Sequence, residues 1–175
     1  KKYKDSVLLG FWQNERYFNK YRNDLIEQFT PKHQYEPCVK ELLELTEKNN
    51  SVSLHIRRGD YLKLNIAMSM EYYEKAIELM KEKVDQPRFF IFSDDINWVR
   101  ENLPLGEDAV YVELVTETRD IDEMMVMASC KHNIIANSTY SWWGAWLNTY
   151  KEKLVIAPLD GFITESLIPS NWIKI

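Results

Sequence analysis

The chain has 175 residues, of which 45% are hydrophobic and 28% are charged, and this composition excludes a disordered, collagen-like or coiled-coil protein. The length predicts one domain, or one domain and part of a second. With 22 Lys and Arg against 27 Asp and Glu the net charge is −5, which disfavours general nucleic-acid binding. The 6 Trp, 10 Tyr and 7 Phe suit either a hydrophobic core or a sugar or base pocket.

Targeting and redox signals are sparse. No apolar run approaches the ~20 residues that a membrane span needs, and no signal peptide opens the chain. The sequence therefore predicts a cytoplasmic protein, with peripheral attachment to the inner face of the membrane as a further possibility. Because the first residue is not Met, we expect a fragment whose N-terminal part is missing. Cys38 and Cys130 fit no metal or redox spacing and are predicted to be free, buried thiols.

Two helices are predicted in the first part of the chain. An apolar stripe over residues 14–29 ends before Pro31, and Pro37 begins a second helix that ends at the Asn49–Asn50 pair. We expect residues 1–50 to form a helical lead-in from the end of another domain.

Short apolar runs then alternate with helical patterns. Such alternation predicts parallel βαβ units, in which strands covered on both faces are almost continuously apolar. The expected fold is α/β, a Rossmann-like parallel sheet of five strands flanked by helices over residues 51–160, followed by a tail over 161–175. The predicted strands are 51–56, 88–92, 109–115, 132–137 and 153–158, and the predicted helices are 69–84, 93–102, 120–130 and 140–150.

Polar residues follow each predicted strand, where open α/β sheets bind ligands. In the HIRRGDY segment, side-chain alternation along the strand places His55 and Arg57 on one face and Arg58 on the other. An arginine fork suits a pair of phosphate oxygens. The alternative is a surface ion pair, for instance between Arg58 and Asp60. Residues 58–60 also spell a cell-adhesion tripeptide, which is expected often by chance.

The NSTYS segment after the fourth strand leads into a helix. The free N–H groups at a helix N-terminus attract an anion, so Ser138, Thr139 and Ser141 could hold a diphosphate together with Arg57. The alternative is an ordinary helix cap by Ser138 or Thr139.

Two acidic segments also follow strands. Asp94 and Asp95 come after Ser93, a predicted helix cap, and either bind a metal or complement the helix dipole. The acidic segment 120–123, with Asp120, Asp122 and Glu123, opens the methionine-rich helix. A carboxylate there could accept the N1–H and N2–H₂ bonds of a guanine edge or could cap the helix.

Three segments carry a family resemblance. HIRRGDY, FSDDINWVRENL and CKHNIIANSTYSWWGAWLN, in this order and spacing, resemble the three motifs of the α-1,2-fucosyltransferases, glycosyltransferase family 11. The resemblance covers residues 7–160. It implies a GT-B enzyme of which this chain is the C-terminal, GDP-fucose-binding half, with the N-terminal domain missing. Family members invert the anomeric carbon as they move L-fucose from GDP-β-L-fucose to the 2-hydroxyl of a terminal galactose, without a metal or cofactor.

The resemblance also assigns roles to residues. Arg57 resembles the essential β-phosphate contact, His55 a nucleotide-pocket residue, and Ser138 with Thr139 the hydroxyl pair on the diphosphate. Glu123 falls where related enzymes place an Asp that binds guanine, and Asp122 remains the alternative. Asp60 is the nearest candidate for a base, unless the base lies in the missing domain. The remaining expected donor-binding residues are Arg58, Ser93, Asp94, Asp95, Asn137, Ser141 and, as the ring nearest the pocket, Trp142.

Three alternatives stay open. The chain could belong to an O- or α-1,6-fucosyltransferase that uses the same donor, although the NSTYSWWGAWL run argues against this. It could be a nucleotide-binding module without catalysis. As a fragment, it could bind GDP and transfer nothing. The expected partners are GDP-fucose, a galactose-terminated glycan acceptor and the missing N-terminal domain.

Overall fold

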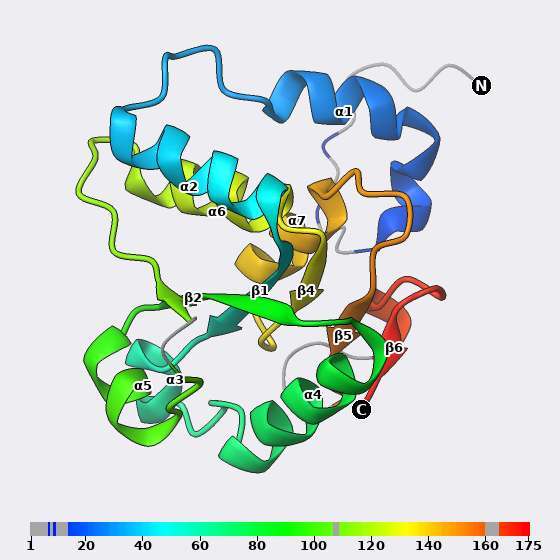
Figure 1. Cartoon of the computed structure of the whole chain (residues 1–175). Helices are drawn as coiled ribbons and strands as arrows, with labels where there is room; N and C mark the ends of the chain where they lie inside the picture. Colours follow the sequence, from blue (N-terminus) through cyan, green and yellow to red (C-terminus); the bar gives the residue numbers. More distant parts are fainter. Residues whose placement is uncertain (1–6, 8, 10–13, 107–108, 160–164) are drawn as a thin grey trace.

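A parallel sheet of six strands forms the centre of the computed structural model, which describes residues 7, 9, 14–106, 109–159 and 165–175 (Figure 1). All strand pairs are parallel, and the order is β3-β2-β1-β4-β5-β6. This is the Rossmann strand order, which changes direction between β1 and β4. The predicted fold is therefore confirmed. The strands are β1 (Asn50–Ile56), β2 (Pro87–Ser93), β3 (Val110–Tyr111), β4 (His132–Ile134), β5 (Val155–Ala157) and β6 (Ile173–Lys174).

Helices cover both faces of this sheet, as the apolar strands require. Along β1, Leu54 and Ile56 belong to the core that α4 and α5 complete, while α2, α6 and α7 cover the opposite face (Figure 1). Because side chains alternate along a strand, His55 faces the α6 and α7 side. The helices are α1 (Arg22–Phe29), α2 (Pro37–Lys48), α3 (Gly59–Lys63), α4 (Met70–Lys83), α5 (Ile96–Asn102), α6 (Arg119–Ser129) and α7 (Thr139–Leu147).

The lead-in differs in part from the prediction. The helix that begins at Pro37 is present, but residues 14–29 form two 3-10 turns, Glu15–Tyr17 and Asn19–Tyr21, before α1. The break falls at Phe18, whose φ is −135°. Its ring lies 5.4 Å from that of Trp143 and 5.3 Å from that of Trp146, so tertiary packing interrupts the helical pattern.

Four other features also differ from the sequence pattern. The sheet has a sixth strand, β6, inside the predicted tail, and the third strand has only two of the seven residues expected over 109–115. Ser93 ends β2 instead of capping a helix, and its Oγ accepts a bond from the N–H of Asp95, the N-cap residue of α5. The five-residue α3 after β1 was not predicted, because one turn of helix carries no periodicity.

Both cysteines are free thiols, and Cys130 is buried as predicted. The prediction that Cys38 is buried is wrong, because it is exposed on α2. In the part of the chain that the structure describes, no helix has the length and apolar character that crossing a membrane requires.

A buried amide network fixes β4 against its neighbours. The Asn133 side chain, which is fully buried, donates to Ser53 Oγ on β1 at 2.7 Å and to the carbonyl of Met127 on α6 at 2.9 Å. Its own oxygen accepts from Asn148, just after α7, at 2.8 Å. Buried amides are stable only when bonded in this way, so the network sets the position of the strand that leads into the NSTYS segment.

Replacing Asn133 with Ala should lower the free energy of unfolding by about 3 kcal/mol, because three hydrogen bonds are lost and buried partners are left unpaired. Urea unfolding with an unchanged m value measures this loss. The matched control is Asn102→Ala, which removes an exposed amide that also donates to a backbone carbonyl and should cost less than about 0.5 kcal/mol. Equal losses in the two variants would contradict the structural role of Asn133.

Candidate functional site

A cavity of about 500 Å³ lies where β1, β2 and β4 end. Ligands of doubly wound sheets bind at this edge, next to the point where the strand order reverses. Most of the predicted site residues come together here. The lining residues are His55, Arg57, Asp60, Tyr61, Ser93, Asp94, Arg119, Asp120, Glu123, Ser138, Thr139 and Tyr140.

Arg57 contacts two carboxylates at the wall of this pocket. Its Nη2 lies 2.7 Å from Oδ1 of Asp60, and its Nη1 lies 3.1 Å from Oδ2 of Asp94. The guanidinium also lies 5.4 Å from the ring centroid of Tyr61. Since the Arg57 side chain is 35% exposed, part of the fork remains open to a ligand.

Arg58 turns away from the pocket. Its Nε lies 3.1 Å from Oδ2 of Asp95, and its guanidinium stacks over the ring of Trp98. His55 and Arg57 line one pocket, as side-chain alternation predicted. Arg58 does not line it, so the expectation that Arg58 binds the donor is wrong. The suggested ion pair between Arg58 and Asp60 is wrong, because the Asp60 carboxylate reaches Arg57 from the first turn of α3.

His55 is held neutral in the pocket wall. The side chain is buried, its Nδ1 has no hydrogen-bond partner among the described residues, and its ring lies 5.6 Å from that of Tyr140. Burial lowers the pKa of His55 to about 4, with Asp94 opposing the shift and Arg57 adding to it. A neutral imidazole offers one donor and one acceptor, so at pH 7 His55 can bond a polar ligand without adding charge.

The N-terminus of α7 forms another wall. Ser138 is the N-cap residue, and its Oγ accepts a bond from the N–H of Tyr140 at 3.3 Å. The capping role is therefore present, and Ser138 and Thr139 line the pocket as well. Hydroxyl groups and free backbone N–H groups at a helix start are suited to an anion.

Of the two residues considered for the guanine contact, Glu123 lines the pocket and Asp122 does not. Glu123 lines the cavity and accepts a bond from Nε of Arg119 at 2.7 Å. Burial raises the pKa of Glu123, and the Arg119 charge opposes that shift. Asp122 lies outside the pocket, where it accepts bonds from Thr116 at 2.6 Å and from Thr118 at 2.9 Å. It also lies 3.1 Å from His33 of the lead-in.

Three more expected contacts are not found at the pocket, because the side chains are used in the core. Asn137 is buried and donates to the carbonyl of Ile66 at 2.6 Å. Ser141 bonds the carbonyl of Ser138 at 3.2 Å, within its own helix. The expectation that the Trp142 ring is nearest the pocket is wrong: its Nε1 donates to the carbonyl of Leu167 at 2.9 Å and the ring packs against Trp172.

Asp94 and Asp95 pair with different arginines and do not face the same site. Asp94 faces Arg57 in the pocket. The expectation that Asp95 binds the donor is wrong, because Asp95 pairs with Arg58 and does not line the pocket. Within the described ranges, no group of three or more His, Cys, Asp and Glu side chains is arranged to hold a metal ion.

Three residues that line the pocket were not predicted from the sequence: Tyr61, Arg119 and Tyr140. All three lie in polar segments that follow predicted strands. Aromatic rings and a single arginine in such a segment carry no pattern that distinguishes a pocket residue from a surface residue.

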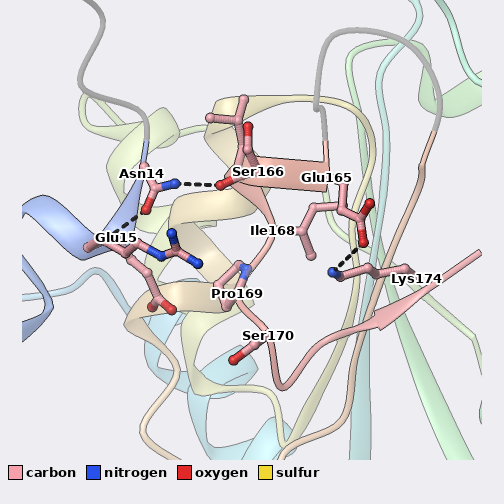
Figure 2. Close-up of a pocket in the computed structure, with 10 residues that line it drawn as sticks. Asn14, Glu15, Glu165, Ser166, Ile168, Pro169, Ser170 and Lys174 are labelled. Atoms are coloured by element: carbon pink, nitrogen blue, oxygen red, sulfur yellow. Dashed lines mark hydrogen bonds and ion pairs between the residues drawn. The ribbon is translucent and has the colours of Figure 1, made fainter.

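A second polar cavity, of about 280 Å³, lies between the N-terminal turns and the C-terminal segment (Figure 2). Figure 2 shows Asn14 bonded to Ser166, and Lys174 paired with Glu165. None of the predicted site residues lines this cavity. The pocket at the ends of β1, β2 and β4 is therefore the stronger candidate.

Comparison with known proteins identifies the family of the chain. The model of a family described as glycosyl transferase family 11 matches residues 3–175. The chain belongs to this family. An Escherichia coli alpha-1,2-colitosyltransferase is 40% identical over 95% of this chain and 61% of its own length. The O-antigen biosynthesis glycosyltransferase WbnK of Escherichia coli is 36% identical over 99% of this chain and 56% of its own length.

More distant relatives of this family 11 chain include the galactoside alpha-(1,2)-fucosyltransferase 2 of Hylobates lar, 22% identical over 80% of this chain and 44% of the relative. Among solved structures, fucosyltransferase NodZ from Bradyrhizobium aligns over 74% of this chain and 58% of its own, with 12% identity and a TM-score of 0.40. The chain thus spans about three fifths of the length of the first two relatives.

The buried neutral His55 predicts a pH-dependent stability. Its folded pKa of about 4 lies below the unfolded value of about 6.5, so the unfolded state binds more protons between these values and stability falls as pH decreases. Between pH 7 and pH 5 the wild type should lose about 2 kcal/mol more than His55→Gln. Urea unfolding of both proteins at the two pH values measures the difference, and parallel losses would contradict a neutral buried His55.

Proposed function

We propose that the pocket at the ends of β1, β2 and β4 binds GDP-β-L-fucose and that the whole protein transfers the fucose, with inversion, to the 2-hydroxyl of a terminal galactose on a glycan. The names of two relatives, an alpha-1,2-colitosyltransferase and an alpha-(1,2)-fucosyltransferase, support the linkage. A GDP-colitose donor is the second candidate, because the colitosyltransferase is 40% identical and colitose is L-fucose without its 3-hydroxyl group.

One observation carries the proposal: Arg57 and the N-terminus of α7 line the same pocket. Cleavage of the bond between the sugar and the diphosphate leaves growing negative charge on the departing GDP. Groups fixed around that charge stabilise the transition state. Arg57 supplies a permanent positive charge, and α7 supplies backbone N–H groups together with the Ser138 and Thr139 hydroxyls. In this proposal these groups take the part that a metal has in other glycosyltransferases, and no cofactor is used.

The guanine base is assigned to the α6 side of the pocket. The Glu123 carboxylate is buried to 7% exposure and can accept two parallel bonds from the N1–H and N2–H₂ of guanine. A uracil edge offers no such pair of donors, and buried polar groups left unpaired are costly. Glu123 therefore supports guanine selectivity, whereas Asp122, held by two threonines, does not reach the base.

Calorimetry with GDP, GDP-fucose, GDP-colitose and UDP tests the proposal. We expect GDP to bind, UDP to bind far more weakly, and the preferred nucleotide sugar to identify the donor. Product analysis with galactose-terminated acceptors then gives the linkage. No binding of GDP at millimolar concentration would overturn the proposal, and equal binding of GDP and UDP would remove the role of Glu123.

Replacing Arg57 with Ala should weaken GDP binding by about 10- to 100-fold, because a charge-assisted fork to phosphate is lost. Transfer by the whole protein should fall by about 10²–10³. The matched control is Arg100→Ala, which removes an arginine paired with Glu113 outside the pocket and should leave binding and transfer unchanged. Wild-type turnover by the Arg57 variant would contradict the assignment.

A further inference from the structure

We propose that the two carboxylates on Arg57 have opposite roles. Asp94 is a fixed partner that positions the guanidinium for the donor diphosphate. Asp60 is an exchangeable partner that occupies the guanidinium until phosphate oxygens displace it. This inference rests on the proposed function only in that a diphosphate binds at Arg57.

The Asp94 carboxylate is anchored at both oxygens. Its Oδ1 accepts a bond from the backbone N–H of Arg58 at 2.8 Å, and its Oδ2 lies 3.1 Å from Nη1 of Arg57. The side chain is only 24% exposed at the end of β2. It therefore ties β2 to the segment after β1 and fixes one edge of the arginine fork.

Gly59 makes room for this anchor. A Cβ added to Gly59 would lie 2.5 Å from Oδ2 of Asp94, which is closer than non-bonded atoms approach. Any side chain at position 59 would push the carboxylate away from Arg57. Gly59 is the first residue of α3, a position at which most other residues would form a helix more readily than glycine. The closeness of Asp94 explains why glycine is found there.

The Asp60 carboxylate is held much more loosely. It is 57% exposed, and among the described residues Arg57 Nη2, at 2.7 Å, is its one recorded side-chain partner. Exposed ion pairs of this kind contribute little stability, whereas phosphate oxygens form stronger, bidentate bonds to arginine. Phosphate can therefore replace Asp60 on Nη2 while Asp94 remains on Nη1. Asp60 is then a competitor for the anion site in the donor-free protein, a role distinct from the base that the sequence suggested.

Calorimetry with GDP and with inorganic pyrophosphate, at low salt, separates the two roles. Asp60→Asn should bind both ligands about two- to fivefold more tightly, because a competing charge is removed. Asp94→Asn should bind them about tenfold more weakly, because Arg57 loses a charge-assisted partner. Simple repulsion predicts the opposite for Asp94, since removing any negative charge near the pocket favours an anion. Tighter binding by both variants would overturn the proposal.

Gly59→Ala supplies a test that changes no charge. If displacement of Asp94 disturbs Arg57, this variant should bind GDP and pyrophosphate more weakly than the wild type. This variant also tests the positioning role of Asp94 if Asp94→Asn does not fold. Wild-type affinity in Gly59→Ala would contradict the positioning role. The matched control is Asp95→Asn, which removes the neighbouring carboxylate that faces Arg58 and should alter affinity by less than about twofold.

The two ligands also separate this inference from the proposed function. If the wild type binds pyrophosphate with the expected shifts in the variants but does not select GDP, the roles of Asp60 and Asp94 stand and the donor assignment fails. If GDP is selected but Asp60→Asn and Asp94→Asn shift affinity in the same direction, the inference fails and the donor assignment stands. Binding of neither ligand overturns both.

Discussion

The pairing of β1 with both β2 and β4 is the constraint on which the site depends. Because β1 is parallel to both neighbours, three chain segments far apart in sequence end at one edge of the sheet. Arg57 follows β1, Asp94 follows β2, and Ser138 lies on the segment that leads from β4 into α7. The pairing of the strands therefore brings these residues together. The buried Asn133 network holds β4 in register against β1 and α6.

Charge compensation shapes the pocket in the absence of a ligand. The permanent charge of Arg57 is balanced by two carboxylates, and that of Arg119 by Glu123. His55 contributes no charge at neutral pH, because burial keeps it deprotonated. With His55 neutral, the lining holds two arginines and four carboxylates, a formal charge of 2 − 4 = −2. In the proposed exchange, a diphosphate enters by replacing one carboxylate partner of Arg57. Such a site holds its arginines in place without a large repulsion or an uncompensated buried charge.

Much of this arrangement could be predicted from the sequence, because chemistry-bearing residues directly follow apolar strands. Alternation along β1, extended one residue beyond its end, placed His55 and Arg57 on one side, and both line the pocket. The rule ends with the strand at Ile56, so it could not show that Asp60, on an unpredicted turn of helix, reaches Arg57. Nor could it show the direction of Trp142, because a helix with Trp on several sides has no single apolar face. Two-residue strands such as β6 carry no periodicity at all.

A crystal structure of the protein with GDP tests the central claim most directly. The account predicts diphosphate oxygens within about 3 Å of the Arg57 guanidinium and of the hydroxyl or N–H groups at the start of α7. Asp60 should be displaced from Arg57, and Asp94 should still be bound to it. GDP in the cavity of Figure 2, or in the pocket without contact to Arg57, would contradict the account.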